Sequence, residues 1–176
     1  NKIHFANSKS YETDVLIGAD GPLSKVNKIA EIQNNRKFWV AKQIKVKYKT
    51  NPDTYKVFFN IPDFFSWVVP ENEDTARIGC ASSSNINEHF ENLIKTLNVD
   101  KSKIIEYEGA LIPQYHPFNN YKKNNVYLIG DAASLIKNIS GGGLLPAIKS
   151  SHALANALNK NKSYKRELSK TVLKSL

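Results

Sequence analysis

The middle of the chain alternates between apolar and polar positions with a period of two, which is typical of β-strands with one wet face. Over residues 43–49 an apolar set alternates with a lysine set: Ile44, Val46 and Tyr48 against Lys45, Lys47 and Lys49. Residues 55–61 have the composition of a second strand. Because the turn-forming sequence Asn51-Pro52-Asp53 separates the two strands, we expect them to form a hairpin.

Two more strands, a helix and an extended segment are predicted after this pair. The strands cover residues 64–69, which Pro70 should end, and residues 76–81. A helix is predicted from about residue 84 to 97, because apolar residues recur there with helical spacing at Ile86, Phe90, Leu93, Ile94 and Leu97. Residues 104–112 return as an extended segment that Pro113 closes. The middle of the chain is therefore predicted to be a mainly antiparallel sheet with one helix.

Two apolar runs near the ends of the chain show no such alternation. They are residues 14–19, DVLIGA, and residues 126–129, VYLI. Continuous runs of this length are typical of buried strands, and we expect the first run to be buried on both faces. Each run meets an acidic turn at once, Asp20-Gly21 in the first case and Gly130-Asp131 in the second.

Helices are expected after both acidic turns. Pro22 begins one or two helical turns that end near Ile29, at a position where proline is tolerated. After the second turn, the Gly-rich loop 140–143 precedes a long amphipathic pattern that ends near Leu158. A strand, an acidic turn, a Gly-rich loop and a helix thus follow one another over residues 126–158.

The fold class predicted from these patterns is α/β, or α+β overall. Residues 1–30 and 110–163 are expected to form one discontinuous domain, and residues 31–109 an inserted antiparallel-sheet domain. Residues 164–176 are expected to start a C-terminal helical region. Apolar residues recur there every four positions, and we expect this helix to pack on its own protein rather than on a membrane, through Tyr164, Leu168, Val172 and Leu176.

Composition narrows the possible functions. The chain has 176 residues, 41% of them hydrophobic, and contains no apolar run long enough to span a membrane. Cys80 is the only cysteine and the four histidines are scattered, so neither a disulfide nor a metal site is expected. Methionine is absent even at position 1, which indicates part of a longer polypeptide. The net charge of +9 favours acidic partners, but the lysines are spread out and no nucleic-acid-binding motif is present.

The two acidic turns have the chemistry of a site for a large polar cofactor. An aspartate just past a strand can accept hydrogen bonds from ribityl or ribose hydroxyls. Glycines before a helix let the backbone approach a flat ring or a phosphate. The helix N-terminus behind them offers unpaired N–H groups and a partial positive charge.

These turns and their order resemble the superfamily of flavoprotein monooxygenases and geranylgeranyl reductases, which are FAD enzymes with the para-hydroxybenzoate-hydroxylase type of fold. The segment DVLIGADGPLSKV resembles its Asp-Gly motif, with matches at Asp20, Gly21 and Ser24, whereas Asn27 stands where many members carry arginine. The segment VYLIGDAASLIKNISGGG resembles its Gly-Asp motif and Gly-rich loop, with matches at Gly130, Asp131, Ala132, Ala133, Gly141, Gly142 and Gly143. The resemblance implies part of a Rossmann-like FAD-binding domain with an inserted sheet domain for the substrate.

Two features resemble the geranylgeranyl reductases more closely than the hydroxylases. Ser134 replaces the histidine that hydroxylases commonly have after Gly-Asp-Ala-Ala, and the loop ends in three glycines. The segment Phe65–Pro70, followed by Ile78-Gly79, resembles the aromatic motif of those reductases. Flavin halogenases carry a related motif, and a core aromatic residue on a strand would also account for Trp67.

The resemblance implies FAD as the cofactor and assigns the site residues. The residues implied to bind FAD are Asp20, Gly21, Gly130, Asp131, Ala132, Ser140, Gly141, Gly142, Gly143 and Leu144. The residues implied to contact the substrate are Phe65, Trp67, Pro70 and Gly79. No catalytic acid or base and no metal ligand is assigned. The family's Gly-x-Gly-x-x-Gly motif does not occur in the 176 residues, so this chain alone is expected to bind FAD weakly or not at all and to be inactive.

The resemblance therefore predicts an FAD-dependent oxidoreductase that reduces carbon–carbon double bonds of a prenyl chain, as part of a membrane lipid or its precursor. The electron donor would be NAD(P)H or a ferredoxin-type protein. The protein would be cytoplasmic, with peripheral membrane association through its basic surface. Two alternatives remain open: a flavin-dependent monooxygenase of an aromatic or polycyclic substrate, and a non-catalytic basic module that binds nucleic acid or membrane.

Overall fold

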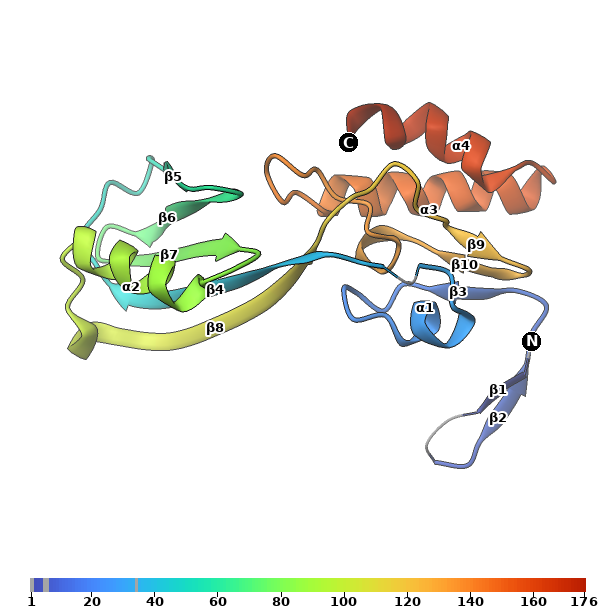
Figure 1. Cartoon of the computed structure of the whole chain (residues 1–176), viewed down its shortest axis with the longest axis horizontal. Coiled ribbons are helices and arrows are strands. Elements are labelled where there is room, and N and C mark those ends of the chain that lie inside the picture. Colours follow the sequence, from blue (N-terminus) through green and yellow to red (C-terminus); the bar gives the residue numbers. More distant parts are fainter. Residues whose placement is uncertain (1, 5–6, 34) are drawn as a thin grey trace. The chain divides into compact units, whose positions relative to one another are not determined.

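The computed structural model describes residues 2–4, 7–33 and 35–176, and the chain divides into two compact units. The first unit comprises Asn1–Lys37 and Pro113–Leu176, and the second comprises Phe38–Ile112 (Figure 1). The mixed helices and strands agree with the predicted fold class. Whether the first unit is the cofactor domain and the second the substrate domain remains a prediction.

The first unit is built around a short parallel pair of strands. Strand β3 (Leu16–Gly18) pairs in parallel with β10 (Val126–Leu128), and β9 (Lys122–Lys123) lies antiparallel on the other edge of β10. Strands β1 (Lys2–His4) and β2 (Ser10–Glu12) form a separate antiparallel pair. The helical segments of the unit are α1 (Lys25–Ala30), η2 (Gly130–Ala133), α3 (Leu144–Asn159), α4 (Tyr164–Thr171) and η3 (Leu173–Ser175).

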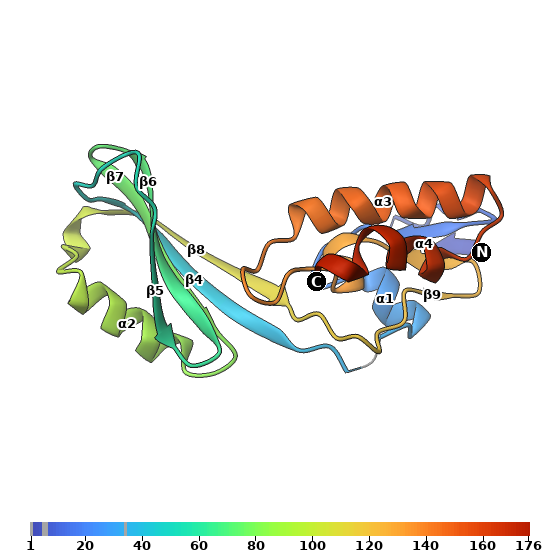
Figure 2. The same cartoon turned by 90° about the horizontal axis from the view of Figure 1, so that it is seen from above.

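The core of the first unit joins the Gly-Asp turn and the end of β10 to α3 and α4, which pack side by side (Figures 1 and 2). Leu128 at the end of β10 is fully buried, and its carbonyl accepts a 2.8 Å hydrogen bond from the Tyr164 hydroxyl. Leu168 and Val172 of the last segment are also fully buried. The prediction that this segment packs on its own protein is therefore confirmed.

The second unit is a five-stranded sheet with the order β5-β6-β7-β4-β8 and one helix against it (Figure 2). Its elements are β4 (Phe38–Lys47), β5 (Lys56–Ile61), β6 (Phe64–Asn72), β7 (Thr75–Ser82), α2 (Ile86–Thr96), the short helix η1 (Lys101–Lys103) and β8 (Ile104–Pro113). The predicted alternation in β4 is confirmed, because Ile44 and Val46 are fully buried and pack in one cluster with Phe90 and Leu93 of α2. The alternate positions of β4, which include Gln43, Lys45 and Lys47, lie on the opposite face of the sheet.

The predicted hairpin of β4 with β5 is wrong. Strand β4 pairs with β7, with Ile44 opposite Ile78, whereas β5 pairs with β6. Only Pro62-Asp63 separates β5 from β6, and only Glu73-Asp74 separates β6 from β7. Such two-residue connections fix neighbouring strands as antiparallel pairs, and the longer segment after β4 does not.

Two further expectations about strands are also wrong. Pro70 does not end β6, which continues to Asn72, because a register shift between Pro70 and Asn72 accommodates a residue without an N–H donor. The run 14–19 is not buried on both faces. Val26 of α1 packs at Gly18, but Ile17, which points to the other face, is 44% exposed. Among the described residues, no helix is long and apolar enough to cross a bilayer.

Candidate functional site

The Gly-Asp turn places its aspartate at the end of β10 through a backbone conformation that favours glycine. Gly130 has φ of +54°, and a Cβ there would lie 3.1 Å from the Cβ of Ala147 on α3. Its N–H donates to the Ser150 hydroxyl of α3 at 3.0 Å. The turn is therefore tied directly to the helix that follows the Gly-rich loop.

The carboxylate of Asp131 is half buried against the N-terminus of α3. A Cβ on Gly143, the residue that precedes this helix, would lie only 2.7 Å from Asp131 Oδ1. Burial raises the pKa of Asp131 above its ordinary value, and the nearby charge of Arg36 opposes this effect. No described residue donates a hydrogen bond to the carboxylate. Asp131 is thus an available acceptor held at the positive end of a helix.

The Gly-rich loop is a tight turn closed by its own backbone. The Gly141 N–H donates to the Lys137 carbonyl at 2.8 Å, and Gly141 has φ of +65°. No side chain caps α3 at Gly143, so the first N–H groups of the helix have no side-chain partner there. Leu144 is 79% exposed and Ile139 is 87% exposed. Of the predicted residues 140–144, Gly143 thus lies directly against Asp131, and the exposed Leu144 follows it at the start of α3.

Asp20 has a different local role, because its carboxylate holds its own turn. It accepts hydrogen bonds from the Ser24 hydroxyl at 2.5 Å and from the N–H groups of Lys25 and Val26 at 2.7 and 3.1 Å. Burial pushes the pKa of Asp20 upward, but these hydrogen bonds outweigh it and lower the pKa. Gly21, with φ of +77°, has open space around its Cα. The predicted contact of Asp20 with FAD remains a prediction.

Arg36, which the sequence did not single out, joins the two acidic turns. Its guanidinium donates to the Pro22 carbonyl at 2.6 Å, to the Asp131 carbonyl at 2.6 Å and to the Ser134 hydroxyl at 2.9 Å. Asp131 and Asp20 both act electrostatically on this guanidinium. Asn27 stands where the family commonly has arginine, and here it is buried and hydrogen-bonded to the backbone of Gln33.

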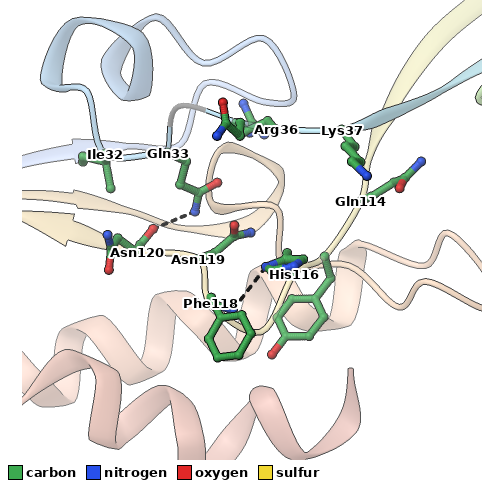
Figure 3. Close-up of a pocket in the computed structure, with 11 residues that line it drawn as sticks. Ile32, Gln33, Arg36, Lys37, Gln114, His116, Phe118, Asn119 and Asn120 are labelled. Carbon is green, nitrogen blue, oxygen red and sulfur yellow. Dashed lines mark hydrogen bonds between the residues drawn. The ribbon is translucent and has the colours of Figure 1, made fainter.

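The side-chain amide of Gln33 also supports the Gly-Asp turn (Figure 3). Its amide nitrogen donates to the carbonyls of Asn120 at 2.7 Å and Ala133 at 3.0 Å, and its amide oxygen accepts from the Ser134 hydroxyl at 3.1 Å. Ser134 is fully buried, so its hydroxyl requires these partners. The one signal in the sequence for this arrangement is that Ser134 replaces the histidine of hydroxylases.

Three of the predicted substrate residues lie together on the sheet of the second unit. Trp67 of β6 pairs with Gly79 of β7, and a Cβ on Gly79 would lie 2.7 Å from the indole Cζ2 atom. The Phe65 ring contacts Trp67 edge to face, with ring centres 5.9 Å apart. Pro70 pairs with Ala76, farther along the two strands. Glycine at position 79 is therefore what allows the indole to lie flat across the strand.

A polar network fixes the indole of Trp67 from the neighbouring strands. Its N–H donates to Gln43 Oε1 at 2.6 Å, and Gln43 Nε2 donates to Glu108 Oε2 at 2.5 Å. Arg77 donates to Glu108 and, at 2.7 Å, to Glu71. The hydrogen bonds from Arg77 and then Gln43 lower the pKa of Glu108. Gln43, Arg77 and Glu108 could not be identified from the sequence. The alternation of apolar and polar residues places them on a solvent-exposed face but does not show which residues they contact.

The residues around Asp131 fit a flavin nucleotide. The carboxylate, which accepts no hydrogen bond from the described residues, suits the hydroxyls of a ribityl chain, and the missing side chain at Gly143 leaves the backbone open beside it. The uncapped start of α3 suits a partial negative charge. No group of metal-ligating side chains occurs in the part of the chain that the structure describes.

Comparison with known proteins gives relatives but no matching family model. Over 165 residues the chain is 30% identical to chloroplastic geranylgeranyl diphosphate reductase from Nicotiana tabacum, covering 85% of this chain and 34% of that protein. Over 174 residues it is 30% identical to digeranylgeranylglycerophospholipid reductase 3 from Methanosphaera stadtmanae, covering 87% and 43%. The chain thus spans less than half the length of these curated relatives.

Solved structures share the fold at lower identity. A geranylgeranyl bacteriochlorophyll reductase-like protein from Thermoplasma acidophilum superposes with a TM-score of 0.70 at 22% identity, covering 92% of this chain and 45% of that one. HpxO from Klebsiella pneumoniae, in complex with FAD and uric acid, superposes with a TM-score of 0.60 at 15% identity, covering 96% and 49%. At these identities the likeness concerns the fold alone.

Proposed function

Since this chain belongs to the FAD-dependent geranylgeranyl reductase family, we propose that it is part of an oxidoreductase that saturates carbon–carbon double bonds of a prenyl chain. The observation that most directly supports the flavin part of this proposal is the carboxylate of Asp131, which lies beside the start of α3 and accepts no hydrogen bond from the described residues. The prenyl chain would belong to a membrane lipid or its precursor. The electron donor would be NAD(P)H or a ferredoxin-type protein.

In this proposal the first unit holds and orients FAD. Asp131 accepts hydrogen bonds from the ribityl hydroxyls, and the loop 140–143 together with the start of α3 faces the ring. Arg36 and Gln33 fix the position of the Gly-Asp turn through hydrogen bonds to the carbonyls of Asp131 and Ala133. Asp20 stabilises the neighbouring turn by capping α1. Reduced flavin, when bound, supplies a hydride to one alkene carbon while a proton reaches the other.

The second unit offers an apolar surface that suits a prenyl chain. Phe59, Phe65 and Trp67 form consecutive edge-to-face contacts with ring centres 6.2 and 5.9 Å apart. Such rings bury hydrocarbon without demanding hydrogen bonds. The indole N–H of Trp67, the one polar group of this side chain, donates its hydrogen bond to Gln43. The ring surface that Trp67 presents is therefore apolar.

The test is anaerobic turnover by the full-length, FAD-loaded protein with a reduced donor and a prenyl substrate. Mass spectrometry should show a gain of two hydrogens for each double bond reduced. Trp67→Ala should raise KM for the prenyl substrate and leave FAD absorbance unchanged. Tyr107→Ala is the matched control, because Tyr107 is also an exposed aromatic residue of the sheet, at 65% exposure, but lies outside the cluster. Incorporation of oxygen into an aromatic substrate, with no alkene reduction, would replace this proposal with a monooxygenase.

A further inference from the structure

A hollow of about 520 Å³ lies in the first unit, outside the residues assigned to FAD or to the prenyl chain (Figure 3). Two segments contribute its lining: the residues after α1 are Ile32, Gln33 and 35–37, and those after β8 are 114–116 and 118–120. The two segments are joined by a 2.9 Å hydrogen bond from the Gln114 N–H to the Lys37 carbonyl. Both segments belong to the same unit, so the hollow is a feature of that unit alone.

Basic side chains line the hollow, and two acidic residues outside the lining, Asp131 and Asp20, act electrostatically on one of them, Arg36. Arg36, Lys37 and His116 line the hollow, and no aspartate or glutamate is among its lining residues. Within the described ranges, Lys37 has no carboxylate partner. Elsewhere on this chain lysines do find such partners, as Lys45 does with Glu71 at 2.6 Å. The hollow therefore presents the charge of Lys37 without a carboxylate among its lining residues.

Neutral hydrogen-bond donors stand beside these cations. The amides of Gln114 and Asn119 line the same hollow. His116 Nδ1 accepts the N–H of Phe118 at 3.4 Å, so Nε2 is the ring nitrogen that can donate to a ligand. The Phe118 side chain is 85% exposed and its ring centre lies 5.5 Å from that of His116. Cations and N–H donors are the groups that bind phosphate oxygens.

The hollow is also linked to the cofactor turn. Arg36, which lines it, donates to the Asp131 carbonyl at 2.6 Å. A phosphate near Arg36 would therefore lie in the same unit as the flavin and share a residue with its binding turn.

We propose that this hollow binds the phosphate group of a reactant. Two reactants of the proposed reaction carry phosphate: a nicotinamide nucleotide that donates electrons, and a phosphorylated prenyl substrate. The identity of the ligand as a reactant rests on the proposed function, but phosphate binding by the hollow does not. Lys37 and His116 would supply charge and a donor to the phosphate oxygens, while Arg36 would contribute mainly its charge, since its N–H groups already hold the turns.

The experiment compares Lys37→Gln and His116→Gln with the unaltered full-length protein, all loaded with FAD. Lys9→Gln is the control, because Lys9 is an exposed residue of the same unit outside the hollow. Binding of inorganic diphosphate is measured by calorimetry. KM is then measured in two arms, for NADPH with the substrate fixed, and for a prenyl diphosphate against the prenyl alcohol with dithionite as the donor.

Loss of one charged hydrogen bond should weaken phosphate binding about tenfold or more. A rise in KM for NADPH alone identifies the nucleotide, and a rise for the prenyl diphosphate but not the alcohol identifies the substrate. Lys37→Arg should restore much of the binding. If alkene reduction is absent altogether, the diphosphate titration still decides the matter. Unchanged diphosphate binding in both variants, or a loss of FAD affinity alone, would overturn the proposal.

Discussion

Asp131 is the residue on which the proposed cofactor site depends. Its half-buried carboxylate lies against Gly143, and none of the residues that the structure describes donates a hydrogen bond to it. Replacement by asparagine keeps the shape but removes the charge. Because a charged hydrogen bond contributes about 1.5–3 kcal/mol, Asp131→Asn should weaken FAD binding by roughly 10–100-fold. Flavin fluorescence titration of the full-length protein measures this, with Asp53→Asn, on an exposed turn, as the control.

The same substitution should change how stability depends on pH. Burial raises the folded-state pKa of Asp131 above 3.8, so the folded chain keeps this proton to higher pH than the unfolded chain. The stability of the FAD-free protein should therefore fall as pH rises from about this ordinary value through the raised one. Asp131→Asn should lack this part of the fall, which denaturant titrations at several pH values would show. An identical pH profile in the variant would mean that Asp131 has its ordinary pKa.

Cys80 gives a second prediction at the residue scale. It is fully buried on β7, and burial raises the pKa of its thiol to about 11, which the charge of Lys42 reduces only in part. Since the thiolate is the reactive form, Cys80 should resist alkylation by iodoacetamide in the native protein at neutral pH and react completely in denaturant. Rapid native alkylation, followed by mass spectrometry, would instead indicate an accessible thiol.

Single residues differ in how far the sequence reveals them. Asp131 could be proposed because a strand, an acidic turn and glycines follow one another in the sequence. Arg36 could not, because its partners are two carbonyls and a serine hydroxyl, and the last of these lies 98 positions away. Nothing in the local sequence distinguishes such an arginine from one on a solvated surface.

At the scale of elements, the sheet of the second unit depends on the absence of a side chain at Gly79. A Cβ there would lie 2.7 Å from the ring of Trp67 and 2.8 Å from the Lys42 carbonyl. Gly79→Ala should therefore displace the indole, shift the tryptophan emission and lower stability by about 1–3 kcal/mol. Gly109→Ala on β8 is the matched control, because its Cβ would meet nothing closer than 3.7 Å. Equal effects of the two substitutions would contradict the packing described for Trp67.

The sequence predicts well where the helices and strands lie, but it predicts less well which strands pair. The period-two pattern locates β4, and the period of a helix locates α2, because each reflects which face is buried. The pairing of β4 with β7 depends on connection lengths and on competition among all the strands. Local turn residues such as Asn51-Pro52-Asp53 therefore predicted a bend correctly but suggested the wrong neighbour.

At the scale of the whole molecule, two cores form from separate sets of residues. The cluster around Leu128, Leu154 and Leu168 belongs to the first unit, and the cluster around Ile44, Ile78 and Leu93 to the second. The change from unbroken apolar runs to alternation along the sequence indicated a change of architecture. It did not determine which role each unit has, because that depends on ligands rather than on burial.

The chain has 25 lysines and arginines and 16 acidic residues, and this positive balance predicts how the protein would bind to a lipid surface. The apolar side chains of α4, Tyr164 and Leu168, are buried in the first unit and cannot insert into a membrane. Exposed cations of the same segment remain outside, including Lys162, Lys165 and Arg166. Association with a bilayer should therefore be electrostatic, at about 1 kcal/mol for each cation near the surface.

The full-length protein should bind anionic vesicles at low ionic strength, bind neutral vesicles poorly, and dissociate as salt shortens the Debye length below about 8 Å. Changing Lys162, Lys165 and Arg166 together to glutamine should weaken sedimentation with anionic vesicles by at least tenfold, since each cation is worth about 1 kcal/mol. Because these side chains are exposed, the variant should unfold at the same temperature as the unaltered protein. Binding that survives high salt would require an inserted apolar surface, for which Ile139 and Leu144, at 87% and 79% exposure, would be the residues to change next.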